Sequence, residues 1–118
     1  DVMAPNDNII KEGTSKTATQ YRQALDTVVK IASSPTALVE GVAQTNQSFG
    51  LSVPRDVYRL ALQVGPITSY KSSDLYVRAC RKTAHRDMSL AEIRVVVRVG
   101  SLLSRWEQNN NPITTNTR

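Results

Sequence analysis

The fold of this chain depends on residues 89–106, which read SLAEIRVVVRVGSLLSRW. Ser89 and Glu92 have the S-x-x-E spacing of a capping box, in which each side chain satisfies a backbone N–H of the other residue at a helix start. Residues 93–99 alternate with period two and are rich in valine, which suits a strand. A helical stripe runs through Val95, Val99, Leu102, Leu103 and Trp106. We therefore expect a helix, with a strand over residues 93–99 as the alternative.

Four more helices are expected upstream, because apolar residues recur at offsets of three and four between capping and stop signals. Ser34 and Pro35 suit the start of one helix, and Gly50 suits its end. Gly65 and Pro66 terminate another. The expected helices span about residues 17–32, 35–50, 54–65, 73–85 and 89–106. The sequence thus predicts an all-α fold, a compact bundle of about five short helices.

The chain has 118 residues, which fits a single domain. The helical domain is expected over residues 15–108. Flexible arms are expected at residues 1–14, which lack sustained periodicity, and at residues 109–118, which are rich in Asn and Thr. No apolar run approaches the roughly 20 residues of a membrane-spanning helix, so no membrane span is expected.

A lone cysteine, Cys80, excludes an internal disulfide and fits a reducing compartment. We therefore expect a cytoplasmic or nucleoid-associated protein. Processing from a longer precursor stays open, because the first residue is Asp1 rather than an initiator methionine.

The basic residues are concentrated in one part of the chain. Residues 71–105 hold eight Lys and Arg residues against three Asp and Glu residues, which accounts for the whole net charge of +5. A local excess of positive charge attracts anions more strongly than scattered charge does. The candidate binding residues are Lys71, Arg78, Arg81, Lys82, His85, Arg86, Arg94, Arg98 and Arg105.

Helical spacing arranges most of these residues in two rows. One row is Arg78, Arg81, Lys82 and His85, at positions i, i+3, i+4 and i+7, and the other is Arg94, Arg98 and Arg105. The arginine guanidinium matches phosphate oxygens, so the two rows together would grip a phosphate backbone if they shared one surface. The competing interpretation is that both rows are ordinary solvated helix faces, since no aromatic residues beyond Tyr76 and Trp106 are interleaved with them.

A helix-turn-helix is a further alternative, because Leu60, Ala61, Val64 and Gly65 match the spacing of the first helix and turn of that motif. The second half does not match. Lys71 falls where an apolar residue should anchor the recognition helix, and proline follows the glycine. A plain helix ending is therefore the expected structure here.

Catalytic and cofactor-binding patterns are absent from the sequence. Cys80 and His85 are five residues apart, which sets them at a wide angle on one helix rather than in contact as a dyad. Cys80 is expected in the core, and His85 at the helix end or in the basic row. No set of residues has metal-ligand spacing, and the five glycines form no phosphate-binding loop. We expect no catalytic residue, no metal, no cofactor and no enzymatic activity.

Trp106 ends the last apolar stripe and is expected to pack in the core, with a role as an anchor at an interface as the alternative. Valines on several sides of the last helix suggest that it is central or carries a subunit interface, as in a homo-oligomer. The function expected is nucleic-acid binding through the positive face of residues 71–105. The alternative is a structural or assembly subunit that docks on an acidic protein surface.

Overall fold

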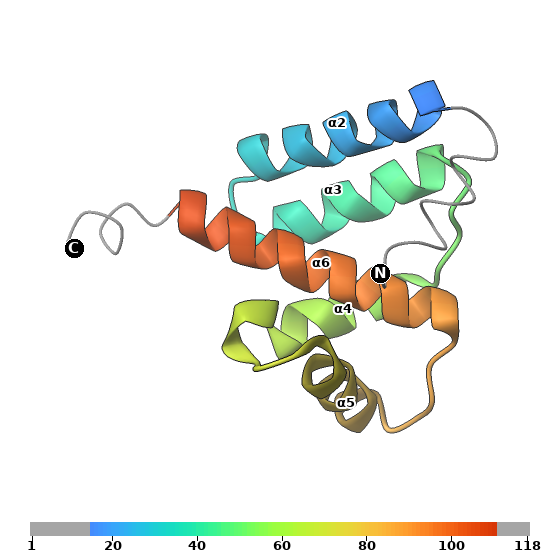
Figure 1. The fold of residues 1–118 in the computed structure, drawn as a ribbon, viewed down its shortest axis with the longest axis vertical. Helices are drawn as coiled ribbons and strands as arrows, with labels where there is room; N and C mark the ends of the chain where they lie inside the picture. Colours follow the sequence, from blue (N-terminus) through green and yellow to red (C-terminus); the bar gives the residue numbers. More distant parts are fainter. Residues whose placement is uncertain (1–14, 111–118) are drawn as a thin grey trace.

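The computed structural model describes residues 15–110, and these residues form an all-α bundle with no strand (Figure 1). Its elements are α2 (Ser15–Ile31), α3 (Pro35–Ser48), α4 (Arg55–Val64), the 3₁₀ turn η1 (Ile67–Ser69), α5 (Ser73–Ala84) and α6 (Leu90–Asn109). The expected fold class of about five helices is confirmed. The arm expected at residues 1–14 lies outside the described residues, as do residues 111–118 of the expected tail. Asn109, expected as the first residue of that tail, ends α6.

α6 is a continuous helix of 20 residues, so the strand alternative for residues 93–99 is excluded. It begins with the expected capping box, in which Ser89 Oγ accepts a hydrogen bond from Glu92 N and Glu92 Oε1 accepts one from Ser89 N, at 3.2 and 2.8 Å. Val95, Val96, Val97 and Val99 are all buried. The period-two pattern therefore reflects a helix that packs on several sides.

α6 occupies the centre of the bundle. It contacts α2 and α3 on one side and α4, η1 and α5 on the other (Figure 1). α3 also packs against α4, which closes the core between the two groups. Because aromatic residues are few, the core is built mainly from valine, leucine and alanine around three buried tyrosines. α2 and α5 therefore lie on opposite sides of the bundle, with α6 between them.

The helix ends follow the sequence signals closely. Ser34 caps α3 by accepting a hydrogen bond from Ala37 N, and Ser72 caps α5 by accepting one from Leu75 N. Gly65, with φ of +94°, ends α4 in a backbone conformation that residues with a side chain rarely adopt. Residues 65–72 then separate α4 from α5. This connection is longer than the three- to four-residue turn of a helix-turn-helix, so α4 has the plain ending that was expected.

Tyr76 fixes α5 against the rest of the bundle. Its side chain is fully buried, and its hydroxyl donates a hydrogen bond to the carbonyl oxygen of Gly65 at 2.7 Å. A Cβ atom added at Gly100 of α6 would lie 2.6 Å from Tyr76 Cζ, so only glycine fits beneath this ring. Tyr70 packs edge-on against the same ring. These contacts orient α5 so that the side of the helix opposite Tyr76 is turned to solvent.

Candidate functional site

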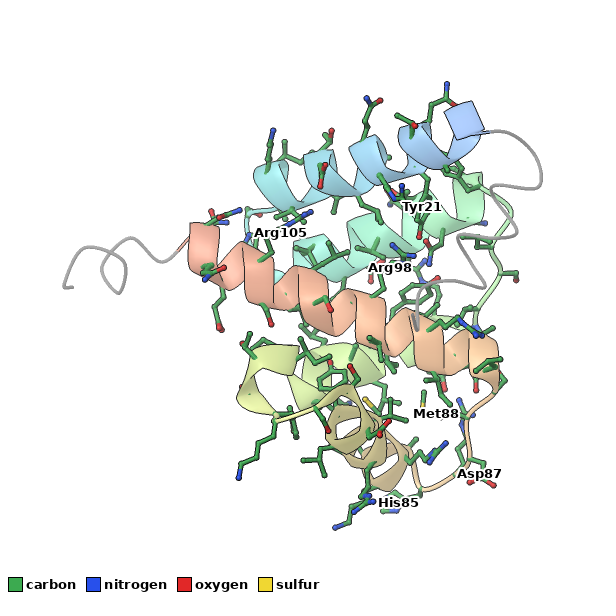
Figure 2. All side chains as sticks on the ribbon, in the orientation of Figure 1. Tyr21, His85, Asp87, Met88, Arg98 and Arg105 are labelled. Carbon is green, nitrogen blue, oxygen red and sulfur yellow. The ribbon has the colours of Figure 1, made fainter. Side chains whose placement is uncertain are left out.

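The solvent side of α5 carries a row of cationic side chains. Tyr76, Val77 and Cys80 are buried and hold the helix against α4 and α6. Asp74 and Leu75 are exposed on the other side. The exposed basic residues there are Lys71, Arg78, Arg81, Lys82 and His85, with Lys71 just before the helix cap. We call this set the α5 face. One of the two rows expected from the sequence is therefore present at the surface, and its last member, His85, lies at the outer margin of the molecule (Figure 2).

The charges of the α5 face are not neutralised by neighbouring side chains. Within residues 15–110, no side chain of the α5 face forms an ion pair or a hydrogen bond. Asp74 lies in the first turn of α5, four residues before Arg78, and Asp87 follows His85; both are exposed. The most cationic stretch is therefore Arg78–His85. It spans about 10 Å along the helix axis, since each residue adds 1.5 Å.

Arg86, the next basic residue, is held in a structural network. Its guanidinium donates hydrogen bonds to Glu92 Oε1 at 3.1 Å and to the carbonyl oxygen of Asp87 at 2.9 Å, and it lies 3.8 Å from Asp56 Oδ2. The hydrogen bond with Glu92 raises the pKa of Arg86. The same hydrogen bond, and that from Ser89 N, lower the pKa of Glu92. Arg86 therefore links α4 to the start of α6 and belongs to a different arrangement from the α5 face.

The second expected row, on α6, is engaged by α2 at two of its three positions, Arg98 and Arg105. Arg98 is only 7% exposed, and its guanidinium carbon lies 5.1 Å from the centroid of the Tyr21 ring. Arg94 is half-buried, and its buried Nε has no hydrogen-bond partner among the described residues. Arg105 Nη2 is 2.7 Å from Asp26 Oδ1 of α2. Figure 2 shows Arg98 and Arg105 on the side of α6 away from His85.

The two rows consequently do not share a surface. Both follow the helical spacing on which they were predicted, but spacing alone does not decide which face of α6 packs against a neighbour. The sequence-based hypothesis of one combined phosphate-gripping surface is corrected by the position of Arg98 between α6 and α2. Within residues 71–105, the α5 face remains as the group of exposed cations that form no ion pair, since the exposed Arg86 and Arg105 are paired with acidic residues.

A buried polar chain, which the sequence did not indicate, joins three helices beside Arg98. Asn46 of α3 is 1% exposed; its Oδ1 accepts a hydrogen bond from the Tyr21 hydroxyl at 2.5 Å, and its Nδ2 donates one to the Tyr58 hydroxyl at 2.7 Å. Burial raises the pKa of Tyr58. Fully satisfied buried polar groups make a packing arrangement specific, because an alternative arrangement would leave them unpaired. These hydrogen bonds therefore hold α2, α3 and α4 in one specific packing arrangement.

Cys80 and Trp106 occupy structural positions as well. Cys80 is fully buried, and burial raises the pKa of its thiol to about 11, so the thiolate needed for nucleophilic chemistry is scarce at neutral pH. Trp106 is half-buried against the core, and its Nε1 donates a hydrogen bond to the carbonyl oxygen of Ala32 at 2.9 Å. The core role favoured for each of these residues therefore matches the structure.

Two hollows on the surface of the bundle differ in the chemistry of their linings. A groove of about 390 Å³ between α2 and α3 is lined by uncharged residues, including Ile31, which is 75% exposed. A polar pocket of about 250 Å³ between α4 and α5 is lined partly by Arg59, Thr83 and Arg86. Within residues 15–110, no cluster of three or more His, Cys, Asp and Glu residues could hold a metal ion. None of the helices described has the length and apolar character needed to cross a membrane.

Comparison with known proteins identifies no relative of this chain. No family model, curated protein or solved structure matches it. The charge, exposure and shape of the α5 face are therefore the basis for a functional proposal.

Proposed function

We propose that this protein binds nucleic acid through the α5 face and acts as a binding protein rather than an enzyme. The observation that carries the proposal is a run of exposed cations on one helix face without acidic partners in residues 15–110. Cations that neutralise phosphates release condensed counterions, and this release supplies most non-specific affinity for nucleic acid. Arginine adds a planar set of donors that matches phosphate oxygens.

The chemistry of the α5 face favours a polyphosphate over an acidic protein. Protein interfaces gain most of their binding energy from a few buried anchors, most often Trp, Tyr and Arg packed in apolar pockets and surrounded by a polar rim. One large apolar side chain, Leu75, is exposed on this side of α5, at 39%, and the other exposed large apolar side chains of the described residues, Ile31 and Leu90, belong to α2 and α6. A phosphate backbone requires no such anchor. The acidic-protein alternative therefore has a single apolar side chain, and no aromatic one, as an anchor on this face, and it remains an outcome of the experiment below.

The size of the α5 face sets the expected salt dependence. Lys71, Arg78, Arg81 and Lys82 carry four full charges. Each phosphate neutralised on B-form DNA contributes about −0.9 to the slope of log K against log salt concentration, so the expected slope is about −3 to −4. Arg98 and Arg105 of α6 are not counted in this slope, because Arg98 is buried against Tyr21 and Arg105 is paired with Asp26.

The test is fluorescence anisotropy with a labelled random-sequence nucleic acid across a salt series. Arg78→Gln/Lys82→Gln removes two charges from the α5 face, and Arg22→Gln/Lys30→Gln removes two exposed charges from α2 on the opposite side of the bundle. We expect the first variant to bind more weakly, with a slope smaller in magnitude by about 2, and the second to bind almost as the wild type does.

Circular dichroism should first establish that all three proteins are folded. Absence of binding at low salt, or an equal loss in both variants, would contradict the proposal. Absence of binding would make an acidic protein partner the better account of the α5 face.

A further inference from the structure

The aromatic residues of the chain are all buried or half-buried in packing contacts. Three tyrosines, Tyr21, Tyr58 and Tyr76, are buried. The other three aromatic residues are half-buried and engaged in contacts: Phe49 packs edge-on against Tyr21, Tyr70 packs edge-on against Tyr76, and Trp106 bonds to Ala32. These six are the only aromatic residues in the sequence. The α5 face therefore has no exposed aromatic ring on which a base could stack, and the nearest in sequence, Tyr70 beside Lys71, is half-buried against Tyr76.

This arrangement discriminates between kinds of nucleic acid. Proteins that bind single strands combine a positive groove with aromatic platforms, and each stacked base contributes about 1–3 kcal/mol. The α5 face has cations but lacks such platforms, and it lies on the outside of a helix rather than in a groove. A duplex suits this surface better, since its bases are already stacked on one another and its phosphates are held in a regular array.

The shape of α5 narrows the choice further. The extensive contacts of α5 are with two helices, α4 and α6, and α5 lies at the edge of the bundle (Figure 1). Its 12 residues form a rod about 18 Å long. The major groove of B-form DNA is about 12 Å wide and admits an α-helix, whereas the major groove of A-form RNA is too narrow and deep for side chains to read.

Two residues point furthest from the bundle. Arg78 and Lys82 are each two residues from the buried Cys80, which is about 200° around the helix, so both stand opposite the packed side. If α5 entered a groove, these two side chains would face its floor. Lys71 and Arg81 would then lie closer to the flanking phosphates.

We infer that the α5 face binds double-stranded B-form DNA, with α5 lying in the major groove. This inference rests on the proposed function and names its target. Arg78 and Lys82 approach base edges, where both residue types bond to guanine O6 and N7. Lys71 and Arg81 contact the backbone and supply the part of the affinity that does not depend on sequence.

The first experiment compares three labelled probes of equal length and sequence at one salt concentration: duplex DNA, single-stranded DNA and duplex RNA. The proteins are the wild type, Arg78→Gln/Lys82→Gln and the α2 control Arg22→Gln/Lys30→Gln. We expect duplex DNA to bind at least about ten-fold more tightly than either competitor, and this preference to disappear in the α5 variant alone.

The outcomes separate the inference from the proposed function. Equal or tighter binding of single-stranded DNA or duplex RNA, still dependent on Arg78 and Lys82, would overturn the inference and leave the proposed function intact. Absence of binding to all three probes would overturn both.

A second experiment tests the groove directly. Dimethyl sulfate methylates guanine N7 in the major groove, so we expect the bound wild type to protect guanines from methylation. Duplex binding without protection would overturn the placement of α5 in that groove.

Discussion

The guanidinium of Arg98 lies over the ring of Tyr21, with 5.1 Å between the guanidinium carbon and the ring centroid. The contact joins the middle of α6 to the first half of α2, two helices far apart in the sequence (Figure 2). The Tyr21 hydroxyl in turn donates a hydrogen bond to Asn46, which is bonded to Tyr58. A positive charge that suggested a binding surface is therefore part of the structural centre of the bundle.

The burial of Arg98 predicts a structural rather than a binding defect when it is removed. Arg98→Ala deletes a desolvated cation–π contact and leaves a cavity, so we expect the free energy of unfolding to fall by roughly 2–4 kcal/mol. Urea denaturation measures this change. Nucleic-acid affinity of the folded variant, measured by anisotropy at low temperature, should match that of the wild type.

The exposed Arg78 offers the matched comparison. Arg78→Ala is expected to leave stability within about 0.5 kcal/mol of the wild type and to weaken binding. A stable Arg98→Ala variant that has lost nucleic-acid binding would instead show that the row on α6 contributes to the binding surface.

Gly100 is expected to tolerate no side chain, because an added Cβ would lie 2.6 Å from Tyr76 Cζ. Alanine normally stabilises a helix interior relative to glycine by up to about 1 kcal/mol. At this position we expect Gly100→Ala to lower the free energy of unfolding by about 1–3 kcal/mol, because the ring of Tyr76 is fully buried and has no room to move. Ser101→Ala, at the next and exposed position of α6, is the control for denaturation. Stabilisation by Gly100→Ala would contradict the packing of α5 on α6.

The ion pair of Arg86 with Glu92 predicts a pH dependence of stability. The hydrogen bond from Arg86 lowers the pKa of Glu92 in the folded protein below its unfolded value, which is about 4.3 for a free glutamate. The ionised form is thus favoured by folding. Its contribution is present above a pH of about 4.3 and is lost as the pH falls through the lower, folded value.

Glu92→Gln tests this dependence, because glutamine can keep the capping box with Ser89 but has no charge to lose. We expect the stability difference between the wild type and Glu92→Gln to shrink as the pH is lowered from 6 to 3 in urea denaturation. In a protein that already carries Arg86→Gln, the Glu92→Gln substitution should change the free energy of unfolding by less at pH 6 than it does in the wild type. A stability difference that is constant across this range would rule out the ion pair as its source.

The helices could be predicted from the sequence because their signals are local. The Ser89 and Glu92 capping box, the serine caps at positions 34 and 72 and the stop at Gly65 all act within a few residues of the chain. They placed the helix boundaries to within about three residues. The preference for helix over strand at residues 93–99 also depended on the capping box, since the valine pattern alone suits either structure.

The candidate site was only half predictable, because it depends on which helix face meets a neighbour. Spacing identified the rows on α5 and α6 equally well. The row on α5 is exposed because Tyr76 and Cys80 lie on its opposite side, whereas the row on α6 meets Tyr21 and Asp26 of a helix some 70–80 positions earlier. The buried position of Asn46 depends on the same kind of long-range contact, so no local pattern marks it.

Asp74 is the acidic residue that shares α5 with the proposed binding surface, and its removal should strengthen binding. It is exposed in the first turn, four residues before Arg78. A unit charge about 7 Å from a phosphate in water repels it by about 0.6 kcal/mol, so we expect Asp74→Asn to raise the affinity for duplex DNA by roughly two- to five-fold at low salt. The gain should vanish at high salt because the charge is exposed and screened. The control is Glu107→Gln, which removes an exposed acidic residue at the end of α6 and should leave the affinity unchanged.

The comparison of these two variants separates a local effect from an effect of net charge. If Asp74→Asn and Glu107→Gln raise the affinity equally, the protein attracts DNA through its overall charge and α5 has no special role.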